Sequence, residues 1–157
     1  MEKTNVMRIL DQKKIKYEGI TYECDEFHDG LEIATKLNED PNIVYKTLVL
    51  CNSQKKYYVF MLPVSSELDL KKCAKAVNEK SLDLLPLKDV LPTTGYVRGG
   101  CSPIGMKKQF KTVIAKNNLT DIVFSGGKIG FQVKMKYEDL KKAISIIEAD
   151  IIKGEWV

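Results

Sequence analysis

Two glycine-rich segments, at residues 95–105 and 125–130, are best suited to chemistry, because they hold seven of the ten glycines in the chain. Glycine leaves backbone amides uncovered and permits turns with positive φ. Both segments contain a Gly-Gly pair and a serine, so both can donate N–H groups to a phosphate or to a carbonyl oxygen that gains charge. Such donors suit the cleavage of an activated ester. Either segment alone is equally typical of a tight connection in a sheet.

One lysine, Lys46, lies in the middle of an otherwise apolar stretch at residues 44–50. Burial of an ammonium group is costly unless the group is paired or meets an anion. A lone lysine in a strand can also place its ammonium group in water while its aliphatic chain lies along the apolar surface. Strand alternation places Lys46 on the same side as Val44 and Leu48, and we therefore predict that it reaches a pocket.

The first glycine segment carries a thiol, Cys101, which could act as a nucleophile with the single histidine, His28, as its base. Nothing in the neighbouring sequence would lower the pKa of this thiol, and no acid is placed to orient His28. A structural role for Cys101 is therefore favoured. The adjacent Ser102-Pro103 pair is typical of a turn, although its hydroxyl could contact a substrate. We predict no catalytic triad.

The cysteines are too widely separated to form a metal site. No Cys-x-x-Cys pair occurs, and the single histidine cannot supply the usual second pair of zinc ligands. Scattered cysteines of this kind are typical of buried thiols in a reducing compartment. We predict no disulfide, no metal and no cofactor. The four cysteines are Cys24, Cys51, Cys73 and Cys101.

The length of 157 residues predicts a single domain, residues 1–157. A hydrophobic fraction of 44% with 29% charged residues is typical of a globular protein rather than a disordered one. The longest apolar runs, such as residues 57–64, are too short to cross a bilayer, and the first residues lack the apolar core of a signal peptide. We expect a cytoplasmic protein without a membrane partner.

The charge balance is mildly positive, with 25 Lys and Arg against 21 Asp and Glu. This excess alone does not identify a nucleic-acid-binding protein. Lysines on a helix usually form its solvated face, but three clusters leave a phosphate-rich partner open. These clusters lie at residues 71–75, 107–111 and 134–142.

Strand and helix patterns alternate irregularly along the chain, which predicts a mixed-sheet α+β domain rather than a regular βαβ array. Thr4 and Asp69 are expected to cap helices, and Asp29 with Glu32 has the form of a capping box. A helix from about Pro86 should end at Gly95. A last helix should run from Tyr137 and include Ile147. Strands are expected at residues 15–23, 43–51, 57–64, 81–84, 112–115, 122–125 and 129–135, the second and third forming a hairpin.

Four segments together resemble the YbaK/EbsC family of freestanding aminoacyl-tRNA editing proteins. They are YKTL at 45–48, LDLKK at 68–72, GYVRGGCSPIGMKK at 95–108 and SGGK at 125–128. The likeness runs over essentially the whole chain and is closest to the bacterial deacylases that clear Cys-tRNA(Pro). It implies a barrel-like α+β domain with flanking helices, related to the editing domain of prolyl-tRNA synthetases.

The resemblance also implies an activity. Such proteins act in trans on tRNA(Pro) charged with cysteine, in some cases also on Cys-tRNA(Cys), in a transient complex with prolyl-tRNA synthetase. In the proposed mechanism, the thiol of the substrate attacks the ester carbonyl, cyclises and releases the tRNA. This mechanism requires neither a general base from the protein nor a cofactor.

Residue by residue, the likeness implies a catalytic role for Lys46 and Gly100. Lys46 and Thr47 would hold the terminal adenosine and the aminoacyl group, and the glycine segments would surround the reacting carbonyl. The other implied substrate-binding residues are Tyr22, Gly99, Cys101, Ser102, Ser125 and Gly126.

The chain departs from close relatives in the second glycine segment, where they often read SGGKRGLD. Here Ile129 and Gln132 replace the charged pair, so another small residue such as alanine on tRNA(Pro) is an alternative substrate. A second alternative is a non-catalytic module that binds aminoacyl-tRNA through its lysine-rich faces.

Overall fold

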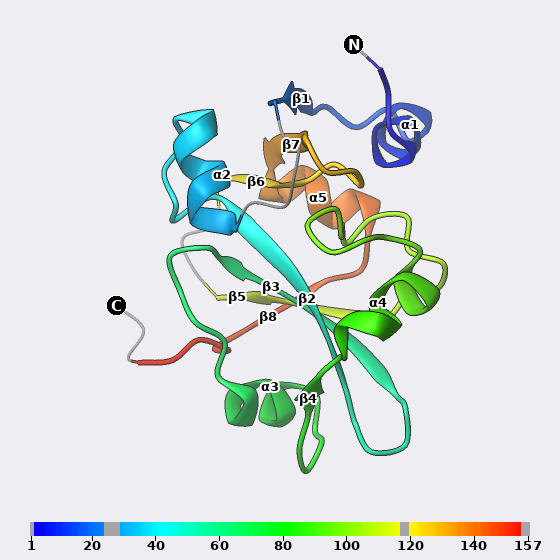
Figure 1. Cartoon of the computed structure of the whole chain (residues 1–157), viewed down its shortest axis with the longest axis vertical. Helices are drawn as coiled ribbons and strands as arrows, with labels where there is room; N and C mark the ends of the chain where they lie inside the picture. Colours follow the sequence, from blue (N-terminus) through cyan, green and yellow to red (C-terminus); the bar gives the residue numbers. More distant parts are fainter. Residues whose placement is uncertain (1, 24–28, 117–119, 155–157) are drawn as a thin grey trace.

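The computed structural model describes residues 2–23, 29–116 and 120–154. Five helices and eight strands lie in these ranges (Figure 1). Their order is α1 (Asn5–Gln12), β1 (Glu18–Thr21), α2 (Gly30–Leu37), β2 (Tyr45–Cys51), β3 (Tyr57–Pro63), α3 (Leu70–Ala76), β4 (Asp83–Leu84), α4 (Leu87–Thr94), β5 (Lys111–Ala115), β6 (Asp121–Ser125), β7 (Phe131–Lys136), α5 (Tyr137–Ala143) and β8 (Ile147–Ala149). None of the described helices is long and apolar enough to cross a membrane.

The strands form two sheets, and Figure 1 shows helices around them. The smaller is antiparallel in the order β1-β7-β6, and the larger is mixed in the order β4-β2-β3-β5-β8. They meet at a bridge between Val44 and Val123, where the Val123 amide donates to the Ile43 carbonyl at 2.9 Å. The predicted mixed-sheet α+β fold is confirmed. Among the described strands, no continuous ladder closes the two sheets into a barrel.

The predicted helix caps are present. The Thr4 hydroxyl accepts from the Met7 amide at 3.3 Å, and Asp29 with Glu32 forms the capping box of α2. The Asp69 carboxylate accepts from the first amides of α3. Helix α4 ends at Gly95, whose φ of 87° lies in the left-handed region. Local side-chain chemistry therefore determines where these helices begin and end.

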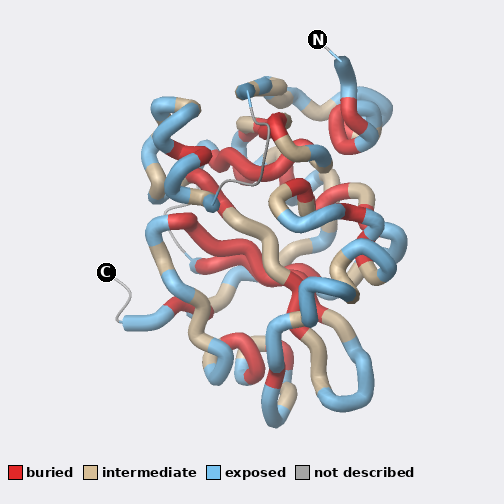
Figure 2. Tube along the Cα trace, viewed as in Figure 1, coloured by how far each residue is buried: buried red, intermediate tan, exposed pale blue. Residues whose placement is uncertain are grey.

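Strand β3 is central, because its two faces enter two different cores. Tyr58, Phe60 and Leu62 pack with α3, whereas Val59 and Met61 pack toward α1 and the smaller sheet. Side chains of a strand alternate between faces, and both faces of β3 are buried. Figure 2 shows the buried residues following the central strands, with exposed residues in the turns and on the outer sides of the helices.

The end of the chain differs from the prediction. Helix α5 stops at Ala143, since Ile144 is extended with φ −140° and ψ 155°. Ile147, expected on that helix, instead begins β8, which pairs in parallel with β5. The β-branched isoleucines here suit a strand, and the partner strand lies far away in the sequence.

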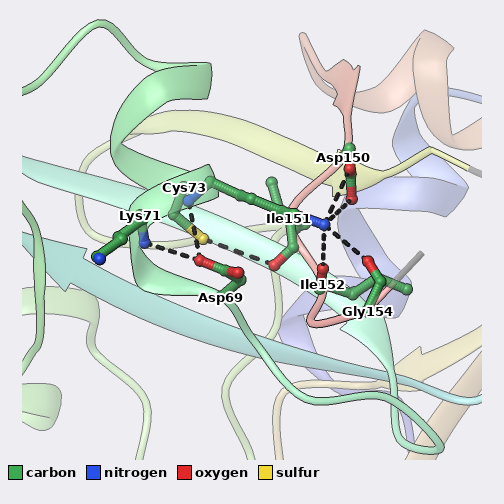
Figure 3. Close-up of polar contacts among 8 residues, drawn as sticks. Asp69, Lys71, Cys73, Asp150, Ile151, Ile152 and Gly154 are labelled. Atoms are coloured by element: carbon green, nitrogen blue, oxygen red, sulfur yellow. Dashed lines mark hydrogen bonds and ion pairs between the residues drawn. The ribbon is translucent and has the colours of Figure 1, made fainter. Parts of the chain in front are cut away.

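The segment after β8 is tied to α3 by one lysine. The Lys72 ammonium donates to the carbonyls of Ile152 and Gly154 at 2.8 and 2.9 Å and forms an ion pair with Asp150 at 3.1 Å (Figure 3). Ile151 and Ile152 are buried. Part of the predicted lysine cluster at residues 71–75 therefore has a structural role.

Candidate functional site

A cavity of about 430 Å³ lies between α2, β2, the β4–α4 segment and both glycine segments. Strand β2 pairs with β4 only through Leu50 and Cys51 among the described residues. Residues 45–48 of β2 therefore present an edge to the cavity, whereas the Val49 carbonyl accepts from the Leu85 amide at 2.9 Å, and side chains from both strand faces line the cavity. Most of the wall is apolar. The polar lining residues are Asp29, Lys46, Thr47, Arg98, Ser125 and Gln132.

Lys46 lines this cavity, as predicted. It is half-buried in β2 opposite Leu62, and within the described part of the chain its ammonium makes no hydrogen bond or ion pair. Asp29 also lines the cavity, but its carboxylate caps α2 by accepting from the Glu32 amide at 2.9 Å. A partly desolvated cation without a protein partner is suited to bind an anionic group of a ligand.

Thr47 provides an independent sign of a ligand. Its Oγ1 is buried and has no hydrogen-bond partner in the described structure, although the residue lines the cavity. An unsatisfied buried hydroxyl costs about 1–3 kcal/mol, so its retention needs an explanation. A ligand in the cavity would supply the missing partner.

We expect Thr47→Val to separate stability from activity. Valine keeps the branched shape of threonine and removes the unsatisfied hydroxyl, so the free energy of unfolding should stay constant or rise by up to about 1 kcal/mol. Cleavage of the aminoacyl-tRNA that the family resemblance implies as substrate should fall about tenfold, the value of one hydrogen bond to substrate. Urea unfolding and steady-state deacylation measure the two effects. Full activity in this variant would show that the hydroxyl does not contact the substrate.

The two glycine segments touch each other. A Cβ on Gly100 would lie 3.3 Å from the Ile129 nitrogen and the Lys128 Cα, so any larger residue would push the second segment away by a few tenths of an ångström. Gly99 adopts a φ of 85°, and it lines the cavity together with Cys101. The Gly-Gly pair thus joins the two segments and turns the first toward the cavity.

Several predicted donors are already used within the protein. The Gly100 amide donates to the Val97 carbonyl at 3.0 Å, and the Gly126 amide donates to the Phe131 carbonyl at 2.9 Å. Neither residue lines the cavity. In the described structure, the amides of Gly99 and Cys101 have no such partner, so they are better placed to receive a developing negative charge.

The other predicted contact residues divide between cavity and scaffold. Ser125 lines the cavity while its hydroxyl accepts from the Gly127 amide at 3.1 Å. Ser102 is fully buried outside the cavity lining, and its hydroxyl accepts from the Ile104 amide at 3.4 Å. Tyr22 also lies outside the lining, and its amide donates to the Gly130 carbonyl at 3.0 Å. Ser102 and Tyr22 therefore support the glycine segments in this structure.

Cys101 has the properties of a structural thiol. Burial raises its pKa to about 11, although a hydrogen bond with Thr94 acts in the opposite direction. It packs against the core that contains Tyr96 and Ile104. His28 and Cys24 lie outside the described residues, so a Cys101–His28 pair is not tested. Among the described residues, no cluster of metal-ligating side chains is present.

Cys101→Ala is expected to stay active. With a pKa of about 11, only about one thiol in a thousand is ionised at pH 8, too few for an efficient nucleophile. The lost sulfur should cost about 1 kcal/mol of stability because the side chain packs on the core. Deacylation assays should give a rate within a few-fold of wild type. An inactive but folded Cys101→Ala protein would identify a thiol enzyme.

Arg98 and the leucines at the cavity mouth are additional lining residues. Arg98 directly precedes the Gly-Gly pair. This position in the sequence is the feature from which its place at the cavity could have been predicted. Gln132, which the sequence singles out only as a departure from close relatives, is 3% exposed and lines the cavity. Leu84 and Leu87 form an exposed apolar rim.

Comparison with known proteins supports the family that the sequence motifs resemble. Residues 26–143 match the family described as the aminoacyl-tRNA editing domain. A protein of Enterococcus faecalis (strain ATCC 700802 / V583), named "Putative Cys-tRNA(Pro)/Cys-tRNA(Cys) deacylase EbsC", is 42% identical over 140 residues, covering 87% of this chain and 85% of that protein.

Solved structures support the fold. One described as a putative trans-editing enzyme for prolyl tRNA synthetase superposes with a TM-score of 0.80 at 18% identity, covering 98% of this chain and 100% of that one. A hypothetical protein, APE2540, gives a TM-score of 0.86 at 17% identity, with 96% and 100% covered. At this level of identity, these likenesses concern architecture alone.

Proposed function

This chain belongs to the aminoacyl-tRNA editing domain family, in its YbaK/EbsC branch, and we propose that it hydrolyses Cys-tRNA(Pro) and, secondarily, Cys-tRNA(Cys). It acts in trans as a deacylase, in the cytoplasm where charged tRNA is found. The observation that carries the proposal is a cavity in which the Lys46 ammonium and the Thr47 hydroxyl both lack a partner among the described residues.

The lining residues suit an aminoacyl-adenosine. Lys46 would attract the phosphate of the terminal nucleotide or the polarised ester, and Thr47 would bond the sugar or the aminoacyl group. The amides of Gly99 and Cys101 would stabilise the oxyanion. Gly100 and Gly126 would act by holding the two segments together. This assignment gives the chain the positioning and charge stabilisation that an activated ester needs.

The substrate thiol would supply the nucleophile. Its sulfur attacks the ester carbonyl carbon and forms a four-membered thiolactone. The bond from that carbon to the tRNA oxygen breaks, and this oxygen takes a proton from water in place of the one that the thiol released to solvent on ionising. Water later opens the thiolactone to free cysteine. The protein needs no nucleophile of its own, in keeping with the raised pKa of Cys101.

The protein would select its substrate by the size of the amino acid that the tRNA carries. One or two methylene groups are worth only about 1–3 kcal/mol in a binding site, so a synthetase that charges proline also admits smaller residues. Gln132 places a neutral amide, not a carboxylate, in the cavity wall. Alanine on tRNA(Pro) is therefore the second candidate substrate.

A deacylation panel tests the proposal. The protein should release cysteine from Cys-tRNA(Pro) and leave Pro-tRNA(Pro) intact over the same time. Faster release from Ala-tRNA(Pro) would favour the second substrate. Binding of Cys-tRNA(Pro) without release of any cysteine product would favour a non-catalytic module and overturn the proposal.

A transient complex with prolyl-tRNA synthetase would deliver the substrate. Leu87 and Leu91 are 60% and 52% exposed and lie one turn apart on α4, beside the cavity mouth. Exposed apolar side chains of this kind support a protein contact at the site entrance.

A further inference from the structure

A second hollow lies on the other side of α4. It encloses about 760 Å³ between the turn of the β2–β3 hairpin, the end of α4 and the segment that leads into β5. Val90 of α4 lines the candidate site, whereas Pro92 and Thr93 line this hollow. Figure 1 shows the hairpin turn and α4 on the same side of the molecule. We call the hollow the lysine groove, after the lysines in its wall: Lys55, Lys56, Lys107, Lys108 and Lys111.

The positive charge of the lysine groove is poorly compensated. Its described lining contains no aspartate or glutamate, and all five lysines are exposed. None of them makes an ion pair within the described ranges, whereas Lys134 and Lys142 elsewhere are paired with carboxylates. Glu79 is near enough to interact with Lys56, but it accepts a hydrogen bond from Tyr58. Five cations around one groove create a strong local attraction for a polyanion.

Two aromatic rings favour a nucleic acid over another anion. Tyr57 and Phe110 line the groove, are half-buried and meet edge to face with ring centroids 5.5 Å apart. Aromatic side chains beside a track of lysines are typical of surfaces that bind single-stranded nucleic acid, where bases or sugars stack while phosphates meet cations. An acidic protein surface would use the lysines but would not require the rings.

We propose that the lysine groove binds the sugar-phosphate backbone of the tRNA next to its aminoacylated 3′ end. This proposal rests on the proposed function, since the terminal adenosine is taken to occupy the candidate site. Helix α4 has eight residues and is therefore about 12 Å long. A strand that leaves the candidate site beside this helix reaches the groove within a few nucleotides, and the phosphates there carry no sequence requirement.

Charge reversal tests the groove directly. The Lys108→Glu/Lys111→Glu double variant should weaken binding of uncharged tRNA(Pro) at least about tenfold at 0.1 M salt, measured by fluorescence anisotropy. The slope of log affinity against log salt should fall by about two, one for each lost phosphate contact. With Cys-tRNA(Pro), KM should rise while kcat stays close to wild type.

The matched control uses a second lysine-lined hollow. Its lining also holds five lysines, but it includes the carboxylate of Asp139, which pairs with Lys142, and it has no aromatic ring among the described lining residues. Lys13→Glu/Lys16→Glu therefore makes the same change in net charge at a lysine-lined hollow without the rings. This control should reduce tRNA affinity by less than about threefold. Equal losses in both double variants would indicate unspecific attraction and overturn the proposal. Unchanged affinity in the groove variant would also overturn it, and would favour an acidic protein as the occupant.

Two further measurements separate folding and catalysis from docking. The glutamine variants, Lys108→Gln/Lys111→Gln, should show a smaller loss of affinity in the same direction with unchanged thermal unfolding. A cysteinyl ester of adenosine, which lacks the tRNA body, should be cleaved equally by wild type and the groove variant. If wild type cleaves neither this ester nor Cys-tRNA(Pro), the deacylase proposal fails, whereas binding of uncharged tRNA still decides the role of the groove.

Discussion

Lys46→Met should lower kcat/KM for Cys-tRNA(Pro) by about 10²- to 10³-fold, the usual effect of removing one well-placed group that stabilises developing charge. Methionine retains an unbranched apolar side chain that adapts to its surroundings. The free energy of unfolding should be nearly unchanged, because the ammonium makes no hydrogen bond or ion pair within the described chain. Single-turnover deacylation and urea unfolding measure the two quantities on the same protein.

Lys72→Met is the matched control, since it removes another partly buried lysine by the same chemical change. The Lys72 side chain is 30% exposed, and its ammonium bonds the carbonyls of Ile152 and Gly154. This variant should lose about 1 kcal/mol of stability and keep its activity, because Lys72 lies outside the cavity lining. Activity close to wild type in folded Lys46→Met would refute a catalytic role for Lys46. Equal losses of stability in both variants would assign Lys46 to the scaffold.

The helices were predictable because their signals are local. Thr4, Asp29 and Asp69 cap helices through side-chain bonds to amides two or three residues away, and such bonds depend on a short stretch of sequence. Strand β8 was missed because its stability comes from parallel pairing with β5. A pairing between distant segments leaves little trace in the local pattern of the isoleucines.

The candidate site was predictable in part for the same reason. Lys46 is conspicuous because it interrupts an apolar strand, and the glycine segments are conspicuous by composition. Which glycine amides remain free depends on the turn that joins Gly100 to Val97, a conformation that residue type alone does not specify. The contribution of Gln132 depends on how the smaller sheet, in which β7 lies between β1 and β6, packs beside β2, which is a tertiary relation.

Replacing the substrate cysteine with serine on the same tRNA(Pro) should slow release at least about a hundredfold. The two amino acids have nearly the same size, so the cavity should accept both. A free thiol has a pKa of about 8.5 and is a few per cent ionised at pH 7, whereas an alcohol is almost entirely protonated. The titratable groups in the described cavity lining are Asp29, Tyr45, Lys46, Arg98 and Cys101, and the one carboxylate among them, Asp29, already caps α2. No described group is thus well placed to activate the serine hydroxyl.

Alanine on tRNA(Pro) provides the control for this comparison, because it lacks any side-chain nucleophile. If the thiol attacks, Ser-tRNA(Pro) and Ala-tRNA(Pro) should both be poor substrates while each still competes with Cys-tRNA(Pro) for binding. The rate with cysteine should also increase as the pH is raised to about 8.5, because the fraction of substrate thiol present as thiolate increases over this range. Comparable release from all three substrates would mean that water attacks the ester, with the amides of Gly99 and Cys101 stabilising the oxyanion. The Lys46→Met effect would persist in that case, because positioning of the ester is needed whichever nucleophile attacks.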